Sequence, residues 1–251
     1  MAESYLTLVN KVLTHLNEVE LTSSTFSTAR GVQTQAKNAV NEAIRYINQR
    51  EFNYPFNHAT QTETLVAGTV RYSLPASTKT VDYNTFRIVK DEDLGVSGGR
   101  LSQIDYNEYI NTYITQEDEI VTTTLNGSHS DSVTTLTLTS TTGFDTAGTA
   151  HIGNEVVSYT GILGNDLTGV TRGAESTTAA AHASGVQVAQ FEEGGVPIFV
   201  SRTLDNNYLL YPFPDKQYSI KFDYFTFPSD LSVHSDTTTI PDRFAPVIVD
   251  G

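Results

Sequence analysis

The sequence predicts an α+β fold: an N-terminal helical hairpin or bundle joined to an antiparallel β-sheet domain, which a small all-β insert interrupts. Three observations lead to this class. Apolar residues within the first 50 positions recur at the three-to-four-residue spacing of amphipathic helices, and the residues after them show strand patterns instead. Residues 121–190 then differ sharply in composition from the chain on either side of them.

Two amphipathic helices are predicted near the N-terminus. One spans about residues 3–20, and the second runs to about Arg50 with Ser27 or Thr28 as its expected N-cap. Joined by a short link, the two helices form an αα-hairpin. Such a hairpin does not bury both apolar stripes by itself, so either both stripes pack on their own domain or part of each packs against a neighbouring copy. The residues expected at such an interface are Tyr5, Val12, Leu16, Ala36, Ala43 and Ile47.

Strand patterns follow on both sides of the interruption. Residues 60–66 and 70–74 are predicted to pair as a hairpin that turns at Ala67-Gly68, and residues 198–202 and 208–211 form a second hairpin. A long aromatic strand, apolar on both faces, is predicted at residues 219–227, either in the middle of a sheet or with one face against a partner. The remaining host elements are strands at 85–90 and 101–104 and a helix over 106–114 that Asp105 caps and that carries tyrosines 106, 109 and 113 on one face.

Residues 121–190 form the interruption. They contain 16 Thr, 7 Ser and 9 Gly, whereas all 8 Pro and all 6 Lys of the chain lie outside them. A composition step this sharp at both ends predicts a small inserted domain. Five short strands within about sixty residues indicate an immunoglobulin-like sandwich or an open barrel. We therefore predict a host domain formed by residues 1–120 and 191–251, with the insert between its two parts.

The charge distribution is acidic. The formal net charge is -14, and residues 91–120 alone hold 8 acidic residues and 1 basic residue. No segment forms a basic stripe, which argues against tight electrostatic binding to nucleic-acid phosphates. An acidic surface of this kind is either a solubility device or a surface past which nucleic acid moves without adhering.

The residue patterns favour no enzyme, no cofactor and no metal. The 6 histidines have no metal-ligand spacing, and His15 and His182 are expected to be solvated. The run from Gly95 to Gly99 has the letters of a serine nucleophile elbow, but a predicted strand follows it where the elbow needs a helix, so a flexible loop is expected. Three adjacent acids, Glu117, Asp118 and Glu119, are expected to form a solvated face, because neighbours on one loop rarely converge on one point.

Targeting and redox signals are also missing from the sequence. No apolar run approaches the ~20 residues of a membrane helix, and the N-terminus lacks the basic and apolar regions of a secretory signal. The chain contains 0 Cys, which excludes disulfides and thiol chemistry.

A series of short motifs runs through the insert. Its main members are Thr135-Leu136-Thr137-Leu138, Gly143-Phe144, Ile152-Gly153-Asn154-Glu155, Leu167-Thr168-Gly169, Thr171-Arg172-Gly173-Ala174 and Ala181-His182. This series resembles a small β module that recurs in phage structural proteins. The resemblance implies a place on the surface of a virion.

The host segments carry three further motifs: the run from Asn41 to Asn48 in the second helix, Tyr72-Ser73-Leu74-Pro75, and Ile240-Pro241-Asp242-Arg243-Phe244. Together with the αα-hairpin they are similar to the head-to-tail adaptors of short-tailed bacteriophages, also called tail tubular protein A. In that family a final helix packs with the first two. The sequence stops at Gly251 where such a helix has barely begun, so we expect the C-terminal helix to be truncated and the native chain to be longer.

This resemblance implies a ring of copies, twelve as a rule, docked beneath the portal protein and above the tail nozzle protein. Double-stranded DNA would pass through the lumen without specific binding, and tail fibres would attach outside. It implies a virion protein of the neck or tail, assembled in the host cytoplasm without a membrane. The six interface residues above would then meet a neighbouring subunit or the portal. The acidic patch at 91–120, with Glu117, Asp118 and Glu119, is expected to face the lumen or the neighbouring subunit.

Two other classes of function are open alternatives. A carbohydrate- or receptor-binding tail protein would use the insert for recognition and would expose aromatic residues there, but the insert has only Phe144 and Tyr159, and both are expected in its core. A glycan-cleaving tail enzyme needs two carboxylates that face each other across a groove. No such pair is evident in the sequence, so the adaptor interpretation is favoured.

Overall fold

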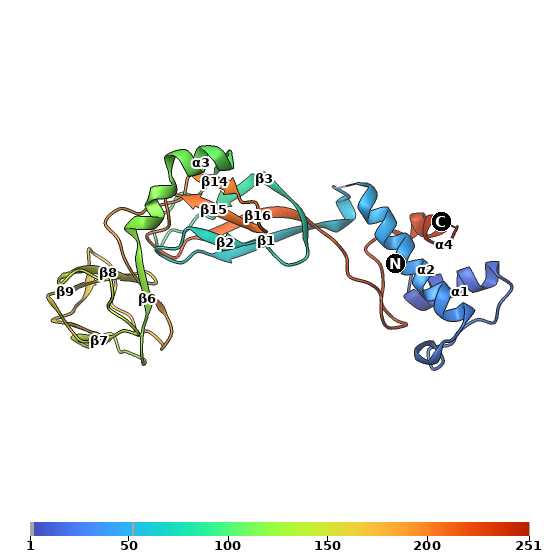
Figure 1. Ribbon diagram of the computed structural model, residues 1–251, viewed down its shortest axis with the longest axis horizontal. Helices are drawn as coiled ribbons and strands as arrows, with labels where there is room; N and C mark the ends of the chain where they lie inside the picture. Colours follow the sequence, from blue (N-terminus) through green and yellow to red (C-terminus); the bar gives the residue numbers. More distant parts are fainter. Residues whose placement is uncertain (1–2, 52, 251) are drawn as a thin grey trace. The chain divides into compact units, whose positions relative to one another are not determined.

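The computed structural model describes residues 3–51 and 53–250 and confirms the α+β class (Figure 1). The chain divides into two compact units. The first comprises the segments up to Thr60, from Pro75 to Val81 and from Asp223 onward, and the second comprises Gln61–Leu74 and Asp82–Phe222. Neither unit is a continuous stretch of sequence. The division into host and insert at residues 121 and 190 stays a prediction, and the expected continuation past Gly251 lies outside the described residues.

The first unit contains the two predicted helices, α1 (Tyr5–His15) and α2 (Val32–Arg50). Helix α1 ends five residues earlier than predicted because Asn17 adopts a left-handed φ of 56°. The amides of Asn17 and Glu18 then donate to the carbonyls of Thr14 and Leu13, which closes the helix end.

The predicted N-cap of the second helix is wrong. Ser27 and Thr28 belong to a short 3₁₀ helix, η1 (Phe26–Thr28), and Gly31 stands at the N-cap position of α2. The reason lies in Phe26, which is buried in the core and holds this turn apart from the helix that follows.

The core of the first unit joins the two ends of the chain. Short helices η2 (Pro55–Asn57), η4 (Asp242–Phe244) and α4 (Ala245–Asp250) complete the unit, and α4 contacts both α1 and α2. The buried cluster that they share includes Leu8, Val9, Leu13, Val40, Ile44, Leu231, Ile240 and Ile248. The residues after 222 are therefore part of the helical unit in folding terms, although they are far from it in sequence.

Two asparagine side chains fasten loops to these helices. Asn41 in α2 donates from Nδ2 to the Leu231 carbonyl at 3.0 Å and accepts from the Leu231 amide at 3.0 Å. Asn10 in α1 holds Leu21 in the same two-way manner, at 2.8 and 2.9 Å. Each amide thus satisfies both backbone groups of one residue that packs its leucine side chain into the core.

Two four-stranded sheets carry the rest of the predicted host. Their strand orders are β1 (His58–Thr64), β16 (Ser219–Thr226), β3 (Thr78–Ile88), β4 (Gly99–Arg100), and β2 (Arg71–Ser73), β15 (Asn207–Tyr211), β14 (Phe199–Arg202), β5 (Ser102–Ile104). The predicted central position of the aromatic strand, β16, is confirmed, and so is the hairpin of β14 and β15. One pairing departs from the antiparallel pattern, because β5 runs parallel to β14.

The predicted hairpin of residues 60–66 with 70–74 is wrong. Its two segments, β1 and β2, belong to different sheets and pair with β16 and β15. The amides of Leu65 and Gly68 donate to the carbonyls of Tyr218 and Pro214, so the link bonds to another segment instead of closing on itself. Gly68 has a φ of +71°, and a Cβ there would lie 2.7 Å from the Ala189 Cβ, so this crossing requires glycine.

The helix that follows β5 agrees with prediction. Helix α3 (Tyr106–Thr112) begins at Asp105, whose side chain accepts from the Asn107 amide at 2.8 Å. Tyr109 is fully buried, and Tyr106 and Tyr113 pack partly buried against the same cluster. The tyrosine face therefore packs into the core of the second unit. The 3₁₀ helix η3 (Ile114–Glu119) continues directly from it.

Residues 121–190 form two sheets within the second unit. The five-stranded sheet has the order β12 (Thr171–Ala174), β9 (Glu155–Tyr159), β8 (Gly148–Ile152), β13 (Gln187–Gln190), β6 (Val121–Thr124), and the three-stranded sheet has the order β10 (Gly161–Leu163), β11 (Asp166–Thr168), β7 (Thr135–Thr137). Leu136 and Leu167 from the smaller sheet share one core with Val157, Tyr159 and Val188 from the larger. Strands β11 and β12 are separated at Gly169, whose φ is 60°. In the part of the chain that the structure describes, no helix is long and apolar enough to cross a membrane.

We predict that Asn41→Ala destabilises the protein by about 1–3 kcal/mol, because it leaves the partly buried amide and carbonyl of Leu231 without partners. Urea unfolding followed by circular dichroism measures this change. Asn38→Ala, on an exposed face of the same helix, is the matched control and should change stability by less than about 0.5 kcal/mol. Equal losses of stability in Asn41→Ala and Asn38→Ala would contradict the stabilising role of the Asn41 hydrogen bonds to Leu231.

Candidate functional site

The six residues predicted at a protein interface divide into two groups. Tyr5 and Ala36 are each 2% exposed and lie in the helical core, where the Tyr5 hydroxyl donates to the Lys37 carbonyl at 2.9 Å. Val12, Ala43 and Ile47 are partly buried, and Leu16 is 54% exposed. Tyr5 and Ala36 therefore shape the unit from inside, whereas the other four lie where another molecule can reach them.

Val12, Ala43 and Ile47 line an apolar groove of about 770 Å³ in the helical unit. The opposite lining comes from the C-terminal segment, with Phe244 and Val247, and from Tyr54 and Phe56. Phe244 is 39% exposed and Val247 is 55% exposed, so the groove opens to solvent with large apolar side chains at its mouth. An apolar surface of this kind is typical of a site that contacts another protein.

The predicted acidic residues lie together on η3. Glu117, Asp118 and Glu119 are all exposed, whereas Gln116 beside them is buried. The Gln116 amide donates to the Tyr109 hydroxyl at 2.6 Å and to the Leu210 carbonyl at 2.9 Å, and its oxygen accepts from the Phe213 amide at 3.1 Å. The three carboxylates therefore project from a turn that is fixed to the core of the second unit.

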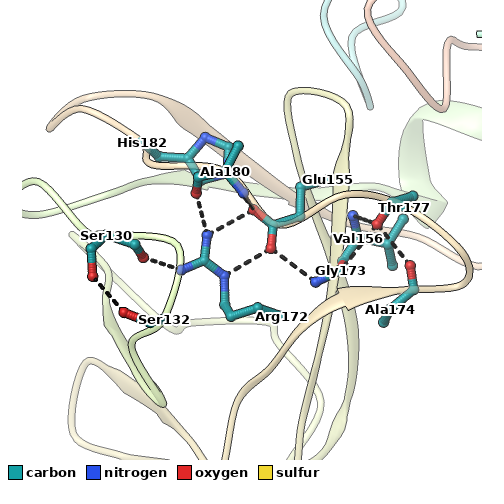
Figure 2. A network of polar contacts seen from close by, with 10 residues as sticks. All are labelled: Ser130, Ser132, Glu155, Val156, Arg172, Gly173, Ala174, Thr177, Ala180 and His182. Atoms are coloured by element: carbon teal, nitrogen blue, oxygen red, sulfur yellow. Dashed lines mark hydrogen bonds and ion pairs between the residues drawn. The ribbon is translucent and has the colours of Figure 1, made fainter. Parts of the chain in front are cut away.

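A buried ionic network in residues 121–190 was not predicted from the sequence. Figure 2 shows the Glu155 carboxylate, at the start of β9, facing the Arg172 guanidinium on β12. Arg172 donates from Nε to one carboxylate oxygen at 2.8 Å and from Nη2 to the other at 2.7 Å. The amides of Gly173 and Ala180 and the His182 Nε2 also reach the carboxylate, at 3.0, 3.1 and 2.7 Å.

The expectation that His182 is solvated is therefore wrong. Its side chain is 10% exposed, and those of Arg172 and Glu155 are 6% and 1% exposed. The partner that buries His182 lies 27 positions away in sequence, so no local pattern around His182 reveals the contact. The sequence carries one indirect signal of the network, because Glu155, Arg172 and His182 each lie in a motif of the predicted insert.

The network keeps the Glu155 carboxyl ionised. Burial raises the pKa of this carboxyl. Hydrogen bonds from Arg172, from His182 and from the amides of Ala180 and Gly173 outweigh burial and lower the pKa from 4.5 to about 2. Because the carboxylate accepts five donors, it has no free position for a substrate or an ion. Arg172 also donates to the carbonyls of Ser130 and Ala180, so the network ties two loops to β9 and β12. Its role is structural.

The run from Gly95 to Gly99, which has the letters of a serine nucleophile elbow, does not have the backbone conformation of one. Ser97 is exposed between an isolated bridge that joins Asp91 to Val96 and the two-residue strand β4, and no helix follows it. The structure thus agrees with the loop interpretation. Among residues 3–51 and 53–250, no group of three His, Asp or Glu side chains is arranged to hold a metal ion.

Comparison with known families bears on the N-terminal half of the chain. Residues 4–121 match the SU10 adaptor protein family. The match runs from the residue that caps α1 through η3 to the first residue of β6, so it includes the αα-hairpin and the acidic turn. It supports a structural role as a phage adaptor, in the neck or tail of the virion. The match points to a phage adaptor family for this part of the chain, in line with the adaptor resemblance of its motifs. No curated protein matches the chain.

We predict that Glu155→Gln destabilises the fold by about 3–5 kcal/mol at pH 7, because it leaves the Arg172 charge buried without its partner. The folded pKa of Glu155 lies below its ordinary value of 4.5, so its stabilisation is present above pH 4.5 and is lost as pH falls toward 2. Urea unfolding at pH 7 and at pH 3 measures both effects.

Glu175→Gln, at an exposed position of the same region, is the matched control and should behave as the unaltered protein at both pH values. The network would lose its assigned role if Glu155→Gln unfolded with the same midpoint as this control.

Proposed function

We propose that the chain forms an oligomeric ring in the neck of a short-tailed bacteriophage, joins the portal to the tail nozzle and lets double-stranded DNA pass. The observation that carries this proposal is the adaptor family match over residues 4–121. Twelve copies, with tail fibres attached outside, are the arrangement that the adaptor resemblance implies. Residues 121–190 decorate the outside of the ring in this proposal.

The apolar groove supports contact with another protein. A solvent-exposed valine or phenylalanine that becomes fully buried contributes about 1.5–3 kcal/mol to association. Leu16, Tyr46, Phe244 and Val247 are all more than one-third exposed, and the last three line the groove. If a neighbouring subunit or the portal covers these residues, each buried side chain adds a contribution of this size to the free energy of association.

The acidic turn supports DNA passage without adhesion. Each phosphate that a cationic side chain neutralises adds affinity, and such affinity slows a strand that must move through a channel. Glu117, Asp118 and Glu119 supply charge of the same sign as DNA, and buried Gln116 keeps their turn in place. We assign these three carboxylates to the lumen or to the boundary with the neighbouring subunit.

The ring and its groove are tested together by electron microscopy of the protein mixed with its portal. We expect rings stacked on the portal, and we expect Val247→Asp to weaken ring formation or docking by about tenfold or more, since one buried valine is worth at least 1.4 kcal/mol. Val233→Asp is the matched control, because Val233 is 54% exposed and does not line the groove. A free monomer or trimer with affinity for glycans would overturn the adaptor proposal.

DNA passage is tested by the rate of ejection from phage particles that carry Glu117→Lys together with Glu119→Lys. We expect slower ejection at low salt, with the difference shrinking as salt screens the new lysines. Glu18→Lys with Glu20→Lys changes the net charge equally at two exposed positions of the other unit. If both pairs of substitutions left the ejection rate unchanged, the lumen assignment of the acidic turn would be wrong.

A further inference from the structure

Two loops of the 121–190 region meet at His129. The first, residues 126–132, and the second, residues 175–184, are joined by a backbone bridge in which the amides of His129 and His182 each donate to the other's carbonyl at 2.9 Å. The Gly127 amide donates to the Ser184 hydroxyl at 3.1 Å, and the Ser184 amide donates to the Ser128 hydroxyl at 3.3 Å. Arg172 also bonds both loops, through the carbonyls of Ser130 and Ala180.

The His129 side chain fixes the base of the first loop. Its Nε2 accepts a hydrogen bond from the Thr137 amide on β7 at 2.9 Å. A nitrogen that accepts a hydrogen bond carries no proton, so the ring is neutral and its hydrogen is on Nδ1. Within the described residues, His129 Nδ1 is buried and has no hydrogen-bond partner.

A second proton on this ring is incompatible with its hydrogen bond to β7. It would have to enter at Nε2, where it would point at the Thr137 amide hydrogen and break that bond. The charged groups that face the ring are Arg172 and His182, with the Glu155 carboxylate bound to both. Arg172 donates to the Ser130 carbonyl one residue away, so a second cation at His129 would lie close to the guanidinium.

We propose that His129 is a proton-sensitive latch, which holds the base of the 126–132 loop on β7 while it is neutral and releases it from β7 when it is protonated. This inference is independent of the adaptor function. Burial, and then the charges of Arg172 and His182, lower the pKa of His129 from its ordinary value of 6.5. Since the folded pKa is depressed, the stabilisation is present above pH 6.5 and is lost as pH falls below it.

The rest of the network survives this acidification. Glu155 keeps its charge until the pH approaches 2, so its ion pair with Arg172 persists through the range in which His129 protonates. His182 donates from Nε2 to the same carboxylate, and Arg172 bonds the carbonyls of Ser130 and Ala180. The latch thus frees the base of the first loop from β7 while β9, β12 and the second loop stay joined through Glu155 and Arg172.

Histidine-selective nitrogen NMR of the whole chain tests the latch together with amide hydrogen exchange. We expect His129 to hold the Nδ1–H tautomer at pH 7. Between pH 6.5 and its folded pKa, protection of the Thr137 amide, corrected for intrinsic exchange, should fall by up to about tenfold per pH unit. In His129→Gln, whose amide oxygen can accept from Thr137 but does not titrate, that dependence should vanish.

His15→Gln, an exposed histidine of the other unit, should leave the pH dependence as it is. If His129→Gln failed to fold, the titration of His129 in the unaltered chain would still decide the question. The latch would be overturned by an ordinary His129 pKa of about 6.5, by Thr137 protection that stays constant from pH 7 to pH 5, or by equal pH dependence in His129→Gln.

Discussion

The helical unit depends on one constraint: α1 and α2 do not cover each other's apolar surface. The structure meets this constraint with residues from the opposite end of the chain, since Leu231, Ile240 and Ile248 complete the core around Leu8 and Val40. The backbone bridge of Ser4 with Thr237 and the Asn41 clamp on Leu231 join the same two ends. The core of the helical unit is therefore complete only with residues from both ends of the chain, so this unit is not continuous in sequence.

The 121–190 region solves a related problem with different chemistry. Its strands are rich in threonine, and its apolar core cluster is shared by the two sheets. The connecting loops are held by polar contacts, and the carboxylate of Glu155 collects donors from two segments, β12 and the 175–184 loop. A buried ion pair is costly to desolvate, and here the completed set of hydrogen bonds offsets that cost. The network around Glu155 therefore specifies the positions of the loops more than it adds to the overall stability.

Sequence patterns predicted the features that depend on neighbours in the chain and missed those that depend on distant partners. Helix α2, the Asp105 cap and the hairpin of β14 and β15 follow from local periodicity and turn chemistry. The false hairpin at Ala67-Gly68 has good turn residues, but the amides of Leu65 and Gly68 bond to a segment about 150 positions away. The burial of His182 and the apolar groove lined by Val12 and Val247 likewise depend on contacts between distant segments, so they could not be predicted from the sequence. The interface residues stay a prediction for this reason, although four of the six are accessible.

The ring connector that we propose must hold strongly to protein and weakly to DNA, and in this proposal the chain separates the two demands chemically. The groove of the helical unit is apolar, so an association built on it depends little on ionic strength. The second unit carries 19 Asp and Glu against 8 Lys and Arg, and repulsion between these charges and phosphate falls off within about 8 Å at physiological salt. The acidic turn can therefore keep a passing duplex from adhering only where DNA comes close to it. Beyond that distance it exerts little drag or guidance, so the ring can remain firmly assembled while its inner surface interacts with DNA only briefly.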